Sequence, residues 1–224
     1  MFAEKKIKMR IFLLVLALIR VNLVSAQNIV EDIDGNKYSL YLFDDKFWTT
    51  KNLEVTRFRN GDIIEQVNTL EEWQRCYENE KPAWCYYENL DINGKIYGKL
   101  YNWYAINDQR GLAPEGWRIP TTGEWAKMKS IFKKEESIKH ITNVDDNVKE
   151  NSIFSDYKKM FSILTGGYRF SDGFFQGKGI IGVFWSTTEF HLVRGESQAD
   201  LADTAANNFV YKSVGASVRL IKDM

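Results

Sequence analysis

The stretch over residues 97–125 constrains this 224-residue chain more than any other part of it. It holds three of the seven tryptophans and two of the three prolines, set among helix and turn signals. Gly98 to Asn107 predicts a helix, because its apolar residues recur on one side, and Gly111 ends that helix. Thr121 and Glu124 form a capping box, and the core-facing spacing of a second helix follows at Trp125, Met128, Ile131 and Phe132. The centre of the chain is therefore predicted to hold two helices joined by a tight loop.

Short extended runs separated by turn residues lie on both sides of this centre. Asp34-Gly35-Asn36 stands between the runs 28–33 and 37–43, which is the turn chemistry of a hairpin. Thr69 and Glu72 form a weaker capping box for a short helix that contains Trp73. Later strands are expected over 161–164, 168–170, 180–186, 207–211 and 216–221. Strands, two central helices and then more strands predict an α+β fold.

The first 26 residues differ in composition from the rest and predict a signal peptide, residues 1–26. A basic start is followed by the unbroken apolar run 11–19, and Val24-Ser25-Ala26 gives the small-residue pattern of a cleavage site before Gln27. The alternative is an uncleaved membrane anchor. Residues 11–24 are too few for the roughly 20 that a spanning helix needs. We therefore expect export and no membrane span after cleavage.

The mature chain, residues 27–224, is expected to form a single domain. The polar segment near 135–158 is expected to be a surface insertion in that domain. Lys and Arg balance Asp and Glu at 30 each, and the predicted leader carries a net charge of +4, so the mature chain carries −4. A mildly acidic chain without a basic stripe is a poor candidate for nucleic-acid binding, which needs clustered Lys and Arg.

The residues that most often carry chemistry are few. Cys76 and Cys85 suit an oxidising compartment and either form a disulfide or remain two independent thiols. The two histidines, His140 and His191, stand in separate polar surroundings, and no pair of residues has metal-ligand spacing. The sequence also lacks a G-x-S-x-G nucleophile elbow. We therefore expect no metal ion, no cofactor and no catalytic residues.

Two further groups of polar residues have alternative interpretations. Paired carboxylates for glycosidic chemistry are available from Asp108, Glu115 and Glu124, but a helix end, a turn and a helix cap explain them better. Asn102, Asn107, Asp108 and Arg110 surround Trp103 and Tyr104. That mixture suits a sugar, with its apolar face on the rings and its hydroxyls on the polar groups. The same residues also suit a buried polar seam that fixes loops.

The central stretch closely resembles the Fibrobacter succinogenes major paralogous domain, a family of exported or cell-surface proteins of Bacteroidota and related bacteria without an established activity. The resemblance therefore implies a protein in the periplasm, on the outer surface or secreted from a Gram-negative bacterium. The resemblance runs from about residue 33 to residue 222. It is carried by Y-G-K-L-Y-N-W-Y-A-I-N-D (97–108), G-L-A-P-E-G-W-R-I-P-T (111–121), E-W (124–125), G-G-Y-R (166–169), F-W-S-T-T (184–188) and G-A-S-V-R-L (215–220). The G-G-Y-R and W-S-T-T elements are similar to those of C-type-lectin-like and formylglycine-generating-enzyme-like domains. The resemblance implies a C-type-lectin-like α+β fold with two helices packed on small twisted antiparallel sheets.

The resemblance does not extend to copper-thiolate chemistry, because that needs a cysteine pair late in the chain. The leading hypothesis is an exported, non-catalytic binding or surface-structural module that recognises a glycan or a cell-surface protein. Its candidate ligand-binding residues are Trp103, Asn107, Asp108, Arg110, Arg169 and Trp185. One alternative is an enzyme that acts on cell-surface polysaccharide through carboxylates near Asp108 and Glu124. Another is an adhesin or fibre subunit, which a long unpaired edge strand or a large exposed apolar patch would favour.

Overall fold

The computed structural model of the chain describes residues 29–128, 130, 165–187, 192–196 and 212–224. Several predicted features lie outside the described residues: the signal peptide 1–26, the polar insertion 135–158, both histidines, and the strands over 161–164 and 207–211.

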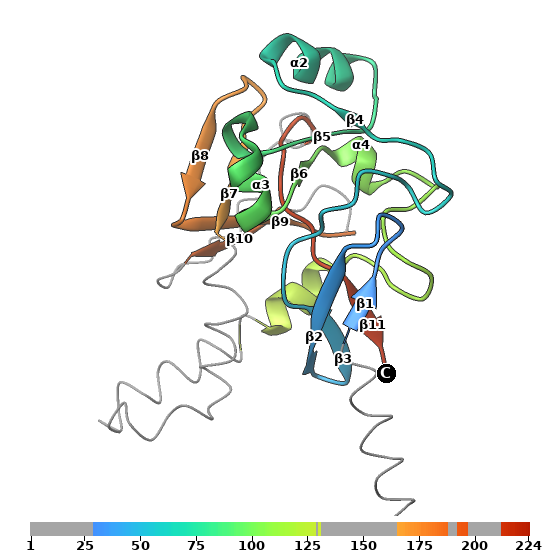
Figure 1. Ribbon diagram of the computed structural model, residues 1–224. Helices are drawn as coiled ribbons and strands as arrows, with labels where there is room; N and C mark the ends of the chain where they lie inside the picture. The colour runs from blue at the N-terminus through green and yellow to red at the C-terminus, as the bar shows by residue number, and fades with distance from the viewer. Residues whose placement is uncertain (1–28, 129, 131–164, 188–191, 197–211) are drawn as a thin grey trace, which may run out of the picture.

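The described elements confirm an α+β architecture (Figure 1). In chain order they are β1 (Ile29–Glu31), β2 (Lys37–Phe43), β3 (Lys46–Thr49), β4 (Glu65–Gln66), α2 (Leu70–Glu78), β5 (Ala83–Cys85), the 3-10 turn η1 (Tyr87–Asn89), α3 (Asp91–Tyr97), β6 (Leu100–Tyr101), α4 (Trp103–Ile106), a helix over 122–128, β7 (Gly166–Arg169), β8 (Phe175–Lys178), β9 (Ile181–Trp185), β10 (Leu192–Glu196) and β11 (Ile221–Asp223).

The strands form three small sheets, with the orders β1-β2-β3-β11, β10-β9-β7-β8 and β4-β5-β6. In Figure 1 the first sheet occupies the lower part of the molecule, the second lies to the left, and α2 lies at the top beyond the third. The expectation of purely antiparallel sheets is wrong, because β4 pairs with β5, and β7 with β9, in parallel.

The predicted hairpin is confirmed, and Asp32 explains its sharp turn. Strands β1 and β2 pair antiparallel. The Asp32 carboxylate accepts hydrogen bonds from the backbone N–H groups of Asp34 and Asn36 at 2.9 and 3.0 Å, and from the Tyr38 hydroxyl at 2.5 Å. Such a side chain supplies the partners that a turn's own backbone lacks. Local chemistry therefore fixes this corner.

The predicted helix from Gly98 to Asn107 is wrong in its first half. Gly98 has a φ of +75° and ends α3, and the chain then extends as β6. The Tyr101 N–H donates to the Ala216 carbonyl at 2.9 Å, and Leu100 and Tyr101 pair with β5. Only the four residues of α4 are helical. The apolar spacing is real, but long-range strand pairing takes the backbone groups that a helix would use.

The C-terminal segment over 213–221 connects the three sheets, and all of its residues are buried. Gly215 bridges to Arg169 in β7, Ala216 to Tyr101 in β6, and Ile221 pairs with Trp48 in β3. The strand expected over 216–221 is thus a series of single bridges, with β11 beginning only at its last residue. The fold depends on this segment, because its partners are more than 30 residues away in the sequence.

Candidate functional site

The two candidate tryptophans belong to the core rather than to a surface. The rings of Trp103 and Trp185 lie 5.5 Å apart, and both side chains are buried in the main hydrophobic cluster. Trp185 is 0% exposed, and its Nε1 donates to the Tyr101 carbonyl at 2.7 Å. Neither ring presents a face on which a sugar could stack. Burial of this kind is typical of large aromatic residues whose polar atom finds a partner inside.

Asn102 holds three segments together and fits the polar-seam interpretation. Its Oδ1 accepts hydrogen bonds from the N–H groups of Ala83 and Ala105, both at 3.0 Å. Its Nδ2 donates to the Lys81 carbonyl at 2.8 Å. The first of these bonds fixes the position of β5, and the second caps α4. Both acceptor positions of Oδ1 and one of the two amide N–H groups are therefore used in bonds within the protein.

Asp108 and Arg110 lie together at the surface and join two loops. The Arg110 guanidinium contacts the Asp108 carboxylate through two bonds of 2.9 and 2.7 Å, and bonds Asp62 at 2.9 Å. Its carbon also lies 4.0 Å from the centre of the Phe58 ring. These bonds lower the pKa of both carboxyl groups. The exposed Asn107 follows as the C-cap of α4. The structure brings these three residues together, but the charged pair is already mutually satisfied.

Arg169 lies in a separate environment beneath the first turn of α2. It is 1% exposed, and its guanidinium carbon lies 4.7 and 5.1 Å from the ring centres of Trp73 and Phe175. Nη2 donates to the Thr69 carbonyl at 2.8 Å, whereas Nε and Nη1 have no partner among the described residues. Cation–π contacts therefore hold this buried charge. No carboxylate of the described residues forms an ion pair with it.

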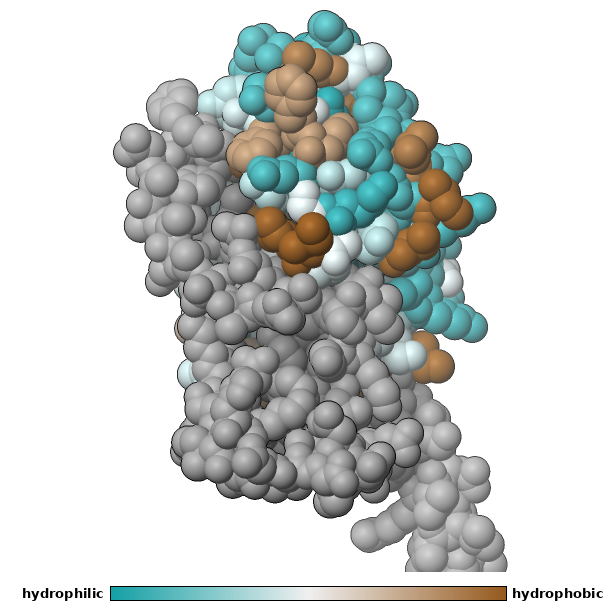
Figure 2. All heavy atoms as spheres, turned by 90° about the vertical axis from the view of Figure 1, so that its left-hand side faces the viewer, coloured by the Kyte–Doolittle hydropathy of each residue, from teal (hydrophilic) through white to brown (hydrophobic). Residues whose placement is uncertain are grey.

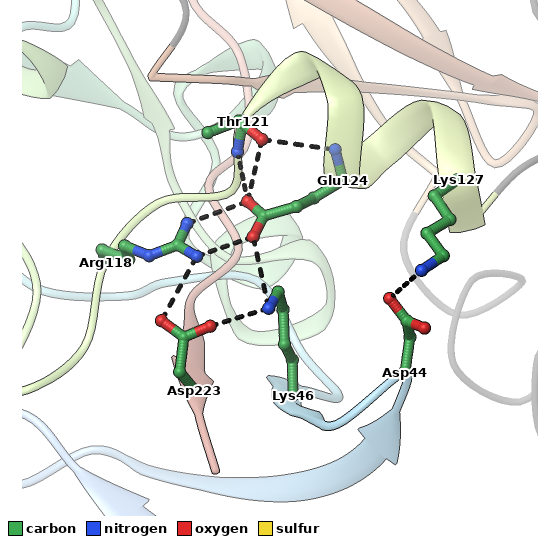
Figure 3. A network of polar contacts seen from close by, with 7 residues as sticks. All are labelled: Asp44, Lys46, Arg118, Thr121, Glu124, Lys127 and Asp223. Carbon is green, nitrogen blue, oxygen red and sulfur yellow. Dashed lines mark hydrogen bonds and ion pairs between the residues drawn. The ribbon is translucent and has the colours of Figure 1, made fainter.

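Glu124, one of the carboxylates that the enzyme hypothesis would use, is held by a network of polar contacts (Figure 3). Its oxygens accept two bonds from the Arg118 guanidinium, at 2.8 and 2.6 Å, and one from the Thr121 N–H at 2.8 Å. Although burial alone would raise the pKa of Glu124, these hydrogen bonds lower it to about 2. Asp223 and Lys46 complete the network from β11 and β3. The group is therefore ionised at neutral pH, and its geometry is that of a structural joint.

The two cysteines are free thiols in the structure, so the disulfide considered from the sequence is absent. Cys76 of α2 and Cys85 of β5 are buried in one hydrophobic cluster with Trp73 and Tyr87. Burial raises the pKa of each thiol to about 11. Both thiols are neutral at physiological pH, which makes them unreactive as nucleophiles.

Neither a metal-ligand cluster nor a membrane-spanning helix occurs among the described residues. Over those residues, the side chains of His, Cys, Asp and Glu form no group of three or more that could hold a metal ion. None of the helices described in the chain has the length and hydropathy to cross a bilayer.

The sequence interpretation missed an apolar surface on α3. This helix buries Asn93 and Gly94 and exposes Ile92 and Ile96, so its apolar side faces solvent. Leu90, the N-cap residue, is also exposed. Figure 2 views the side of the molecule that carries α3 and β8, where apolar side chains in brown lie among hydrophilic ones in teal. We call Leu90, Ile92 and Ile96 the α3 ridge. The four-residue spacing of the two isoleucines was a sequence signal for a helix that the turn residues around them concealed.

The α3 ridge is fixed rigidly to the rest of the molecule. A Cβ on Gly94 would lie 2.1 Å from the Tyr86 ring, so the helix rests directly on that ring. The Asn93 amide donates to the Tyr87 carbonyl at 2.8 Å, and the Lys178 ammonium in β8 contacts Glu88 at 2.9 Å. These contacts fix the orientation of α3, and this orientation exposes Ile92 and Ile96.

Comparisons with known proteins place the chain in a family. The model of the Fibrobacter succinogenes major domain matches residues 43–222, which agrees with the extent of the sequence resemblance. No curated protein and no solved structure matches the chain. Because the match covers most of the chain, including every strand pairing of the C-terminal segment, the protein belongs to the Fibrobacter succinogenes major domain family.

Proposed function

We propose that the protein is an exported, non-catalytic module that binds a protein partner through the α3 ridge. The observation that carries the proposal is the inverted polarity of α3, which buries an asparagine and a glycine and exposes two isoleucines. Leaving large aliphatic side chains in water costs about 25 cal/mol for each Å² that could be buried. Ile92 and Ile96 are one helical turn apart, and large aliphatic side chains exposed side by side in this way are typical of an interaction site.

A protein partner fits this surface better than a glycan does. Aliphatic side chains on a helix bury well against another polypeptide, and they offer no aromatic face for a sugar ring. The tryptophans that would supply such a face, Trp103 and Trp185, are in the core. The candidate polar groups Asp108 and Arg110 are paired with each other. The enzyme hypothesis loses support for the same reason, because Asp108 and Glu124 are both bonded to arginines.

Site-specific photo-cross-linking tests the proposal. A photoreactive phenylalanine analogue at Ile96 should capture one discrete protein on cells that make the chain. The same analogue at Ile63, which is also strongly exposed but stands apart from the ridge, should capture none. Ile92→Glu combined with Ile96→Glu should abolish the capture without lowering the melting temperature, since both side chains are already exposed. Equal capture at both positions, or capture that survives the double substitution, would contradict the proposal.

We extend the proposal to fold and location. The C-type-lectin-like fold is supported by the resemblance of the G-G-Y-R and F-W-S-T-T elements and by the mixed helices and sheets. An experimental structure that superimposes on C-type-lectin-like domains over its sheets would establish it. Export is supported by the leader pattern over residues 1–26. N-terminal sequencing of the protein from a periplasmic or surface fraction should begin at Gln27, and a cytoplasmic protein that begins at Met1 would contradict it.

A further inference from the structure

The exposed side of α3 carries two rows of side chains. Successive residues turn by about 100° around the helix axis, so residues four apart lie in one row. Ile92 and Ile96 form an apolar row, and Asp91 and Lys95 form a charged row beside it. All four side chains are exposed, while the opposite side of the helix is buried. The helix therefore presents an apolar row and a charged row to solvent, side by side.

The charged row has opposite charges at its two ends. Asp91 lies in the first turn of α3 and Lys95 in the last. Neither side chain forms an ion pair with any of the described residues. The neighbouring Lys178, in contrast, is paired with Glu88 at 2.9 Å. The two charges of α3 are thus available to an approaching molecule.

We infer that the partner of the α3 ridge is a second copy of this chain, whose α3 packs antiparallel against the first about a two-fold axis. In naming the partner of this ridge, we build on the proposed function. A two-fold axis that crosses both helices at right angles reverses the direction of the second α3 and keeps each row opposite its own counterpart. Ile92 then faces the partner's Ile96, and Asp91 faces the partner's Lys95. Each contact occurs twice.

Charge complementarity favours this occupant and this direction. The reversal places unlike charges opposite each other at both ends of the charged row. A parallel arrangement would place Asp91 opposite the partner's Asp91, and like charges facing each other across an interface repel. The same reversal joins the two apolar rows and removes them from water. The face of α3 is therefore complementary to a reversed copy of itself in both charge and polarity.

The size and support of α3 set the strength of this association. The helix has only seven residues, so the interface is small and the dimer is expected to be weak. Tyr86 and Asn93 already hold α3 in place, which reduces the ordering that binding would require. Because both copies use the same surface, a two-fold interface is closed. Association should therefore stop at the dimer and should not continue into a fibre.

A charge exchange provides the first test, with sedimentation velocity over a concentration series that reaches about 1 mM as the readout. The unaltered chain should move towards dimer as its concentration rises. Asp91→Lys alone and Lys95→Asp alone should each weaken the dimer about tenfold or more, because like charges then face each other twice. An equal mixture of the two variants should recover the dimer, since both cross-helix pairs become attractive again.

Matched variants control for net charge and folding. Glu115→Lys and Lys81→Asp make the same charge changes at exposed positions outside α3, and should leave the dimer unchanged. Recovery in the mixture separates pairing from damage to the helix, because both chains still carry their substitutions there. A chain that stays monomeric at every concentration, or a mixture that does not recover the dimer, overturns the inference.

Disulfide capture provides the second test and reads out the direction of the helices. Ile92→Cys mixed with Ile96→Cys should give more covalent dimer on a non-reducing gel than either variant alone, because a disulfide needs Cα atoms within about 7 Å. Ile92→Cys mixed with Ile63→Cys should give none above background. A higher yield from Ile92→Cys alone would indicate parallel helices, and that result overturns the inference.

The photo-cross-link at Ile96 separates this inference from the proposed function. Capture of a second copy of the chain supports both. Capture of a different protein, with the chain monomeric in sedimentation, overturns the second copy and leaves the α3 ridge as a protein-binding site. A monomeric chain that captures nothing overturns both.

Discussion

Two helices of this protein begin with the same four-residue motif, but only one of the two motifs also connects its helix to another segment of the chain. At α2 the Thr69 side chain accepts a hydrogen bond from the Glu72 N–H at 3.1 Å, and the Glu72 carboxylate accepts one from the Thr69 N–H. At the helix over 122–128, Thr121 and Glu124 exchange the same pair of bonds at 3.2 and 2.8 Å. Both are capping boxes, as their spacing predicts.

The two motifs differ in the hydrogen bonds that their glutamates accept from residues outside the capping box. Glu72 accepts bonds from the backbone of its own turn, from Asn68 and Thr69. Glu124 also accepts both arms of Arg118, which bridges to β11 through its backbone. A local motif is thus enough to start a helix. The motif also connects its helix to another segment only where a charged side chain of that segment bonds to a partly buried residue of the motif, as Arg118 does to Glu124.

Of the substitutions that test this comparison, removal of Glu124 should cause the largest loss in the free energy of unfolding. Glu124→Ala takes away a cap and leaves Arg118 without its bidentate partner, and should lower the free energy of unfolding by about 3 kcal/mol. Glu72→Ala, its matched control, should cause a clearly smaller loss because only a cap is lost. Urea denaturation followed by tryptophan fluorescence measures both. Equal losses would mean that Arg118 contributes nothing to stability.

The next largest effect should be on the pH dependence of the free energy of unfolding at acidic pH, where Glu124 takes up a proton. The folded-state pKa of about 2 lies below the ordinary value near 4.5, so the carboxylate contributes stability that is fully present above about pH 4.5. That contribution is lost as the pH falls towards 2. Partial exposure reduces its size to about 2 kcal/mol. In Glu124→Gln, the difference in the free energy of unfolding between pH 5 and pH 2.5 should be smaller by about 2 kcal/mol. A curve that keeps its full slope in this variant would contradict the assignment.

The threonines should give similar, smaller effects. Thr69→Ala and Thr121→Ala each remove one hydroxyl acceptor from a helix N-terminus, which costs about 1 kcal/mol. The loss should be slightly larger for Thr121, whose hydroxyl also donates to the Glu124 carboxylate at 2.9 Å. Thermal unfolding of the two variants beside the Thr→Ser versions provides the measurement. Serine should restore most of each loss, and a failure to do so would indicate that the methyl group is the important part.

Lys46 should give the smallest effect. Its ammonium lies 3.9 Å from the Glu124 carboxylate and 2.7 Å from that of Asp223, whose side chain is largely exposed. Exposed pairs are screened by water and salt and contribute little to stability. Lys46→Met should therefore leave the melting temperature unchanged within error at physiological ionic strength. A marked drop that disappears in high salt would show that the network acts as one unit.

Local signals in the sequence were reliable where a few neighbouring residues satisfy one another. The Asp32 turn and both capping boxes are of this kind, because every bond they need lies within a few residues. Prediction failed where distant segments compete for the same groups. Tyr101 lies in an apolar pattern typical of a helix, but its backbone pairs with Ala216. The helix α3 was missed because a turn composition conceals an isoleucine pair.

The candidate site followed the same division. Sequence alone identified Asp108 and Arg110 as neighbours, and they do form a pair. It also grouped Trp103 and Trp185 with them as candidate ligand-binding residues, whereas the structure buries both side chains in the core. Residue type says that a tryptophan has a large apolar face, but not whether that face meets a ligand or the core. The α3 ridge is not visible without the packing that exposes it.

The sequence by itself determined the family of this protein, its first hairpin and the start of its two capped helices. Each depends on residue identity and short-range bonds, which survive without knowledge of the rest of the chain. The tertiary structure alone decided the inward face of the tryptophans and the outward face of α3. It also decided the course of residues 213–221 through all three sheets. These features depend on contacts between residues far apart in sequence, and such contacts exist only once the whole core has closed around them.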